Sequence, residues 1–190
     1  DYYILQVAYL DPSCRRDVEK EFVEPCFEVY MAEELPTLGD YRSIGLEVKP
    51  PTVWRYFVKV DEDVLERFIE KNGLWGIDPR RAGDESVLRN SFALNKKYYA
   101  SLGEKKAFVV SHGKDMIVLK IVGYAEQVVK YYQLEDLEAY VWIGHQRYPT
   151  KGKVWHPGGA HPFIGVHDAL VHNGDFANYY SMTEYLKQRN

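Results

Sequence analysis

The chain has 190 residues, of which 46% are hydrophobic and 27% are charged, and these proportions are typical of a globular domain. They exclude disorder, collagen and coiled coil as descriptions of the whole chain. A formal net charge of −4 argues against a nucleic-acid partner, because nucleic-acid binders usually carry a basic stripe. No apolar run reaches the length of a membrane span. We therefore expect a single domain over residues 1–190, with neither nucleic acid nor membrane as a partner.

The cysteine content and the N-terminal residues bear on the compartment. Cys14 and Cys26 are too few for a disulfide framework, and no basic-apolar-small leader is visible. A cytoplasmic location is therefore expected. The chain opens at Asp1 directly into strand-like residues, so we expect that residues are missing upstream.

The first half of the chain is expected to alternate strands and helices, from hydrophobic periodicity and capping residues. The expected elements are a strand over 2–10, a helix over 12–24, a second helical stretch over 26–34, a strand over 53–60, a helix with Asp63 and Glu66 as its capping box, and a helix over 85–102. We expect no chemistry between residues 11 and 105, whose charges are most simply a solvated surface.

The second half is expected to contain shorter elements. They are strands over 107–111 and 116–122 joined as a hairpin by His112-Gly113-Lys114-Asp115, a helix over 124–132, a strand over 140–143, a strand over 166–171, and a final helix after Phe176. Together the two halves indicate an α+β fold.

Charge and histidine are unevenly distributed. Residues 140–190 carry five Lys and Arg against three Asp and Glu, and the rest of the chain carries 19 against 25. The same segment holds five of the six histidines, which are 145, 156, 161, 167 and 172. A locally positive, histidine-rich segment in an acidic protein fits a small anionic ligand.

The histidines do not have the spacing of a metal site. His167 and His172 flank one predicted strand, and their separation of five points them to opposite faces. His156 and His161 stand in an irregular loop, and no zinc pattern such as H-E-x-x-H is present. We therefore expect no metal and no cofactor.

Hydrolase signatures based on serine or cysteine are weak. No G-x-S-x-G motif is present. Arg15 and Arg16 could lower the pKa of the Cys14 thiol, but a half-buried helix residue is the favoured interpretation. Cys26 is expected in the core.

Two short segments carry residues suited to amide chemistry. In Asn173-Gly174 a side-chain amide and a backbone N–H can point at one spot, as in an oxyanion hole, although Asn-Gly is also a common tight turn. Arg147, at the end of a predicted strand, can bind a carboxylate bidentately, with Thr150 adding a hydroxyl. A surface ion pair is the alternative for Arg147.

Three motifs in order resemble the class II glutamine amidotransferases. They are G-H-Q-R-Y-P-T-K-G (144–152), A-H-P-F (160–163) and A-L-V-H-N-G-D (169–175). The second motif and S-H-G-K-D-M-I-V-L-K-I-V-G (111–123) look most like the amidotransferase domain of archaeal-type glutamate synthase. The resemblance covers roughly residues 105–190. It implies an Ntn-hydrolase-like α-β-β-α sandwich of two antiparallel sheets.

The resemblance also implies roles for individual residues. Arg147 would bind the α-carboxylate of glutamine, and Thr150 would be a neighbouring substrate contact. The Asn173 side-chain amide and the Gly174 backbone N–H would form the oxyanion hole, whereas His161 has no assigned role. In the family an N-terminal cysteine, assisted by its own α-amino group, attacks the glutamine carboxamide, ammonia leaves, and water releases glutamate from the thioester.

Two departures from the family pattern concern the ends of the chain. Asp1 is not the Cys-Gly with which the family begins, and neither Cys14 nor Cys26 has that context. The family also has an acidic residue downstream of H-N-G that holds the substrate amino group, and this chain stops at Asn190. We therefore expect a fragment incomplete at both ends that has no glutaminase activity alone.

The expected function is a glutamine-hydrolysing amidotransferase domain that feeds ammonia to a synthase domain or subunit, foremost for glutamate synthesis. A homo-oligomer is compatible with this function. The alternatives are a class II enzyme with a sugar-phosphate or phosphoribosyl acceptor, a non-catalytic glutamine- or glutamate-binding regulatory module, and a structural α+β domain with an accidental motif.

Overall fold

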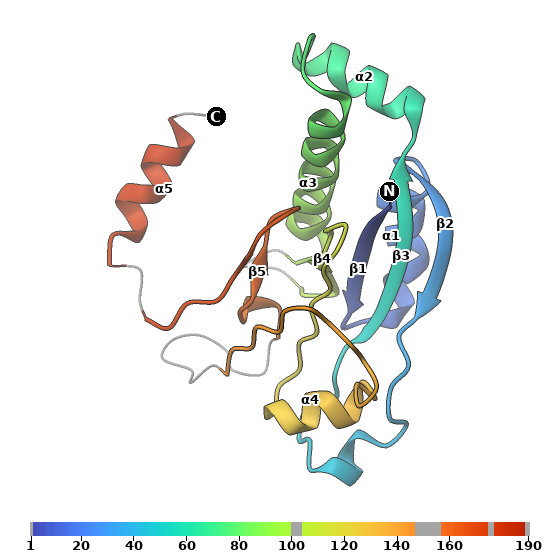
Figure 1. The fold of residues 1–190 in the computed structure, drawn as a ribbon, viewed down its shortest axis with the longest axis vertical. Helices are drawn as coiled ribbons and strands as arrows, with labels where there is room; N and C mark the ends of the chain where they lie inside the picture. Colours follow the sequence, from blue (N-terminus) through green and yellow to red (C-terminus); the bar gives the residue numbers. More distant parts are fainter. Residues whose placement is uncertain (1, 100–103, 147–156, 175–176, 189–190) are drawn as a thin grey trace.

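The structure, a computed structural model, describes residues 2–99, 104–146, 157–174 and 177–188 (Figure 1). It is an α+β arrangement with one large and one small antiparallel sheet in these ranges. This architecture confirms the predicted fold class and is consistent with an Ntn-like α+β fold.

Four strands form the main sheet in the order β2-β3-β1-β4. They are β1 (Tyr3–Tyr9), β2 (Phe27–Glu34), β3 (Thr52–Val60) and β4 (Ala107–Ser111). Strand β1 is central, pairing along its whole length with β3 and at its other edge with β4. Its near-continuous apolar sequence fits a strand covered on both faces. The chain order strand, helix, two strands, helices, strand is the split β-α-β arrangement.

Helices cover one face of this sheet. They are a continuous helical segment made of η1 (Pro12–Cys14), α1 (Arg15–Val18) and η2 (Glu19–Val23), and the long helix α3 (Pro79–Tyr98), which follows α2 (Glu62–Asn72). Odd-numbered residues of β1 point to this face and pack in one core with Val18, Val23, Val87 and Leu94. Apolar burial of this kind, at about 25 cal/mol per Å², holds the helices on the sheet.

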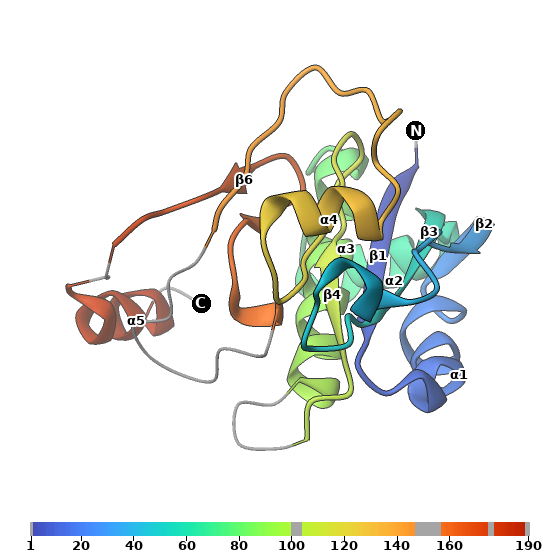
Figure 2. The same ribbon diagram turned by 90° about the horizontal axis from the view of Figure 1, so that it is seen from below.

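The opposite face of the sheet is covered by residues from the second half of the chain. Ala8, Val53 and Phe108 pack there with Val118 and with Tyr131 of α4 (Ala125–Tyr131). Figure 2 shows α4 beside η3 (Tyr41–Ile44) at this side of the molecule. The first and second halves therefore share one packed body.

The small sheet is formed by β5 (Phe163–Ile164) and β6 (Ala169–Leu170), preceded by η4 (Pro157–Gly159). Its connecting turn returns to the main body through Val166, which joins the core on the helical face. A Cβ on Gly113 would lie 3.0 Å from the Val166 carbonyl oxygen, so this close crossing requires glycine. Helix α5 (Tyr179–Lys187) stands apart from both sheets in Figures 1 and 2.

Many of the predicted elements are confirmed with small shifts in their bounds. They are the strands over 2–10, 53–60 and 107–111, the helices over 12–24, 85–102 and 124–132, and the final helix. Helix α2 is capped by Asp61, whose carboxylate accepts the Val64 N–H at 3.0 Å, rather than by Asp63. Helix α3 begins earlier than expected, because Asp78 caps it and Pro79 occupies its first turn.

The predicted helical stretch over 26–34 is wrong, because these residues form β2. They pair antiparallel with β3, with a bulge between Val29 and Met31. Most side chains of β2 are exposed at the sheet edge, so the strand lacks the apolar alternation that identifies a half-buried strand. Pairing with β3 overrides the helix propensity of its glutamates.

Two predicted strands are absent from the described part of the chain, and a third is shortened. Residues 116–122 form no hairpin with β4, the outer strand of the sheet; instead Val118 packs on a face of the sheet, where its N–H donates to the Gln6 side chain at 3.1 Å. Residues 140–143 are exposed and unpaired in the described ranges. The strand over 166–171 shrinks to Ala169–Leu170, since Val166 turns into the core.

Candidate functional site

The structure brings three histidines from the three sequence motifs together. The ring centroid of His145 lies 4.8 Å from that of His161, and His161 lies 6.4 Å from His172. His145 belongs to the first motif, His161 to the second and His172 to the third. Segments 11 or more residues apart in the sequence therefore meet at one place.

The β5-β6 ladder explains why the second and third motifs meet. Phe163 pairs with Leu170 and Ile164 with Ala169. Extending this antiparallel register by two residues places 161 opposite 172. The Phe163 ring also packs edge-on against His161, with 4.7 Å between centroids. The short ladder therefore fixes the relative position of the A-H-P-F and V-H-N-G segments.

Asn173 and Gly174 follow β6 on the exposed side of this histidine group. Gly174 has a φ of 144°, in a region that side chains rarely adopt, and a Cβ on it would lie 3.2 Å from Cε1 of His172. The positive φ favours glycine, and a Cβ at this position would press on the His172 ring. The exposed Asn173 carboxamide and the Gly174 N–H belong to one turn, which is compatible with an oxyanion hole and equally with a tight turn.

Arg147 and Thr150, the predicted carboxylate-binding pair, lie outside the described residues. His145, two residues before Arg147, is the residue of that motif that the structure places in the histidine group. Its buried Nδ1 has no hydrogen-bond partner among the described residues. The structure therefore places a residue near Arg147 in the sequence at the histidine group. The position of the Arg147 guanidinium itself stays a prediction.

Neither cysteine of the chain is suited to be a nucleophile. Cys14 is buried, its Sγ donates to the Asp11 carbonyl at 3.1 Å, and burial raises the pKa of its thiol. Arg15 is engaged by Glu19 at 2.8 Å. Burial also raises the pKa of Cys26. Because the thiolate is the reactive form, both cysteines act as packing residues.

A metal centre does not emerge from the described part of the chain. In those ranges no group of three or more His, Cys, Asp or Glu side chains could hold a metal ion. The three histidine rings are tilted against one another by 56° and 57°. None of the helices in those ranges combines the length and apolar character needed to cross a membrane.

Sequence reasoning missed two residues that line a cavity beside the histidine group, a cavity that Phe163 also lines. His112 was expected in a hairpin turn and Lys120 in a strand, yet both are buried beside a cavity of about 190 Å³. The available signal was a lysine within the apolar run Met116–Val122, where a charge is costly unless it has a partner.

The chain is similar to three proteins. It is 33% identical over 190 residues to an uncharacterized protein of Archaeoglobus fulgidus, covering 98% of this chain and 44% of that protein. It is 26% identical over 175 residues to amidophosphoribosyltransferase 3, chloroplastic, of Arabidopsis thaliana, covering 90% and 31%. It is 34% identical over 96 residues to glutamine–fructose-6-phosphate aminotransferase (isomerizing) of Sulfurisphaera tokodaii, covering 50% and 15%.

The Arabidopsis and Sulfurisphaera enzymes are distant homologues, and they support the class II, Ntn-type glutamine amidotransferase domain expected from the motifs. Neither of the two enzymes is a glutamate synthase, so that finer link stays a prediction. No family model and no solved structure matches the chain. The chain spans less than half the length of each of the three relatives.

Proposed function

We propose that residues 1–190 are part of a glutamine-hydrolysing amidotransferase domain that releases ammonia for a synthase domain or subunit, with glutamate synthesis as the foremost candidate. The observation that carries this proposal is the meeting of His145, His161 and His172. It supports a common site built from the three motifs, each of which contributes one histidine. The distant amidotransferase relatives support it independently.

Each site residue has a defined task in this proposal. Arg147 binds the α-carboxylate of glutamine through a bidentate contact, and Thr150 adds a hydroxyl contact. A cysteine thiolate, supplied by polypeptide outside residues 1–190, attacks the carboxamide carbon. The Asn173 amide and the Gly174 N–H stabilise the resulting oxyanion. The carboxamide nitrogen gains a proton and leaves as ammonia. Water then hydrolyses the thioester, which releases glutamate and the cysteine thiol.

The domain and its partners are part of the same proposal. Helices of the first half cover one face of the main sheet, residues of the second half cover much of the other, and Val166 joins the core on the helical face, which supports one domain over 1–190. A synthase partner in the cytoplasm would receive the ammonia. The printed names of two relatives contain phosphoribosyl and fructose-6-phosphate. Acceptors that carry these phosphorylated sugars are therefore the alternatives to compare with the acceptor of glutamate synthesis.

Glutamine binding by Arg147 provides the first test of the proposal. In the full-length protein, Arg147→Ala should raise the KM for glutamine about tenfold or more, because a bidentate charge-assisted contact is lost. The matched control is Arg67→Ala, which removes an exposed arginine of α2. Glutamate release is measured as a function of glutamine concentration. Equal KM values for wild type and Arg147→Ala would remove Arg147 from the site.

The isolated 190-residue chain gives a second test, of where the nucleophile comes from. Since Cys14 and Cys26 are packing residues whose thiol pKa values are raised by burial, this polypeptide should release no glutamate above blank. The full-length protein should release it. Activity in the isolated chain would refute the external nucleophile.

A further inference from the structure

The cavity beside His112 and Lys120 lies between α3, β4 and residues 158–164, with a volume of about 190 Å³. Its lining combines apolar residues with four residues that have polar side chains: Asn95, Tyr99, His112 and Lys120. The Asn95 carboxamide oxygen already accepts the Val109 N–H at 2.8 Å, so its NH₂ group is the part left to donate. Neither Asn173 nor Gly174 lines this cavity.

Lys120 brings a buried positive charge to the cavity. Its residue is 8% exposed, and burial lowers the pKa of its ammonium to about 8. The Nζ donates to the Ala160 carbonyl at 2.7 Å and lies 5.0 Å from the centroid of the Phe163 ring. An ammonium has three N–H donors, and this carbonyl uses one of them. A buried charge with so few partners calls for a counter-charge.

His112 brings an unsatisfied polar group to the same cavity. It is 7% exposed, and neither Nδ1 nor Nε2 has a hydrogen-bond partner among the described residues. Burial lowers its pKa to about 4, so at neutral pH the ring is uncharged, with one donor and one acceptor. Leaving such groups unpaired destabilises the fold, and buried polar groups in folded proteins are nearly always paired.

We propose that this cavity binds a small monocarboxylate, with its carboxylate held by the Lys120 ammonium and the His112 imidazole N–H and its hydrocarbon part against Phe163 and Val110. One ammonium matches one negative charge. The apolar walls match a short hydrocarbon chain. The volume corresponds to about six water-sized groups, at roughly 30 Å³ each, which suits a ligand such as propionate. The cavity borders the histidine group, because Phe163 lines it and also packs against His161, but the proposal does not depend on glutamine binding.

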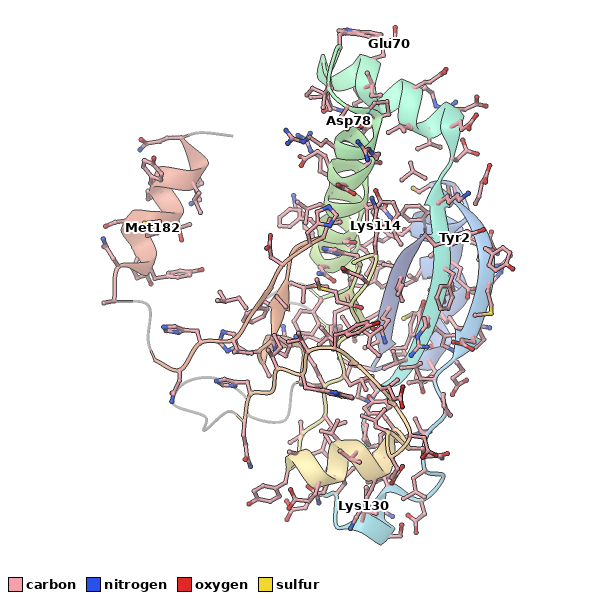
Figure 3. The ribbon with its side chains drawn as sticks, viewed as in Figure 1. Tyr2, Glu70, Asp78, Lys114, Lys130 and Met182 are labelled. Atoms are coloured by element: carbon pink, nitrogen blue, oxygen red, sulfur yellow. The ribbon has the colours of Figure 1, made fainter. Side chains whose placement is uncertain are left out.

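The experiment titrates the full-length protein with propionate by calorimetry and follows the histidine imidazole resonances by NMR. Propionamide has the same shape without the charge, propylammonium reverses the charge, and inorganic phosphate tests for a general anion site. Lys120→Met removes the ammonium while retaining much of the side-chain volume. Its matched control is Lys130→Met, which alters an exposed lysine on α4. Figure 3 labels Lys130 at the opposite end of the view from Glu70.

Saturable propionate binding is expected in wild type and Lys130→Met, with at least about tenfold weaker affinity in Lys120→Met, because a charge-assisted contact is lost. Propionamide and propylammonium should bind at least about tenfold more weakly than propionate, and one buried imidazole should shift on saturation. Absence of propionate binding, equal affinity in Lys120→Met, or tighter binding of phosphate would overturn the proposal. If Lys120→Met does not fold, the ligand comparison and imidazole shift in wild type decide.

Discussion

His161 and His172 lie opposite one another on the extended register of the β5-β6 ladder, with their ring centroids 6.4 Å apart. Two paired residues on each strand thus hold the A-H-P-F segment against the V-H-N-G segment. This relationship positions the turn that carries Asn173 and Gly174. In the proposed reaction the same turn faces the bond that is cleaved.

Gly174 provides the first prediction. Gly174→Ala would place a Cβ 3.2 Å from Cε1 of His172 at a φ of 144°, so the turn must change its conformation. Strain of this kind is on the order of 1–3 kcal/mol. We expect the kcat for glutamine hydrolysis by the full-length protein to fall at least about tenfold, with a drop of only a few degrees in the midpoint of thermal unfolding.

Gly39→Ala is the matched control for that experiment, because nothing lies within 4 Å of a Cβ built on Gly39. It should leave kcat unchanged. A Gly174→Ala enzyme with wild-type kcat would show that the conformation of this turn does not matter to catalysis.

Asp84 provides a prediction on stability. Its carboxylate accepts the Tyr3 hydroxyl at 2.7 Å and pairs with Lys114 at 3.1 Å and His167 at 2.9 Å, which ties α3 to β1 and to the segment before β6. Burial raises its pKa, but these three partners outweigh burial and hold it below its ordinary value. Asp84→Asn should therefore lower the free energy of unfolding by about 1–3 kcal/mol at neutral pH.

The pH dependence of that loss follows from the direction of the shift. A carboxylate with a depressed pKa stabilises the fold above its unfolded pKa, and this contribution disappears as the pH falls through the folded pKa. The gap between wild type and Asp84→Asn should narrow in acid. Asp63→Asn, at an exposed site on α2, serves as the control. A gap that stays constant down to pH 3 would contradict this account.

His112 predicts a different pH dependence, in a window set by its pKa of about 4 against an ordinary 6.5. Between these values the unfolded chain binds a proton that the folded chain does not, so stability rises with pH and is lost on acidification. The loss is on the order of 3 kcal/mol. In His112→Gln this part of the pH dependence should be missing. Denaturant unfolding from pH 7 to 4 measures it, and parallel curves for the two proteins would contradict the prediction.

The main sheet could be predicted where burial dominates its sequence. Strand β1 is apolar except for Gln6 and is packed on both faces, so its pattern identified it. Strand β2 is an edge strand whose stability comes from pairing with β3, and no local pattern reports a partner. Likewise residues 116–122 are apolar enough for a strand, but they cover a face of the sheet, where Val118 bonds Gln6, instead of pairing with β4.

The candidate site was predictable in its parts and not in its assembly. Asn173 and Gly174 stand after a strand, as their sequence context indicated, but the meeting of His145 with His161 depends on long-range packing. The cavity at Lys120 was missed for a related reason. A lysine in an apolar run identifies a buried charge only once the fold shows what surrounds it.

The most direct test of the central claim is the kcat of the full-length protein for glutamine hydrolysis after Asn173→Ala and Asn173→Asp. Both changes remove the amide donor, and the aspartate retains the side-chain shape. Loss of one oxyanion-hole donor should reduce kcat by about 100- to 1000-fold, with a KM close to wild type because the substrate is bound elsewhere. A kcat within about twofold of wild type in either variant would contradict the assignment of this turn to the oxyanion.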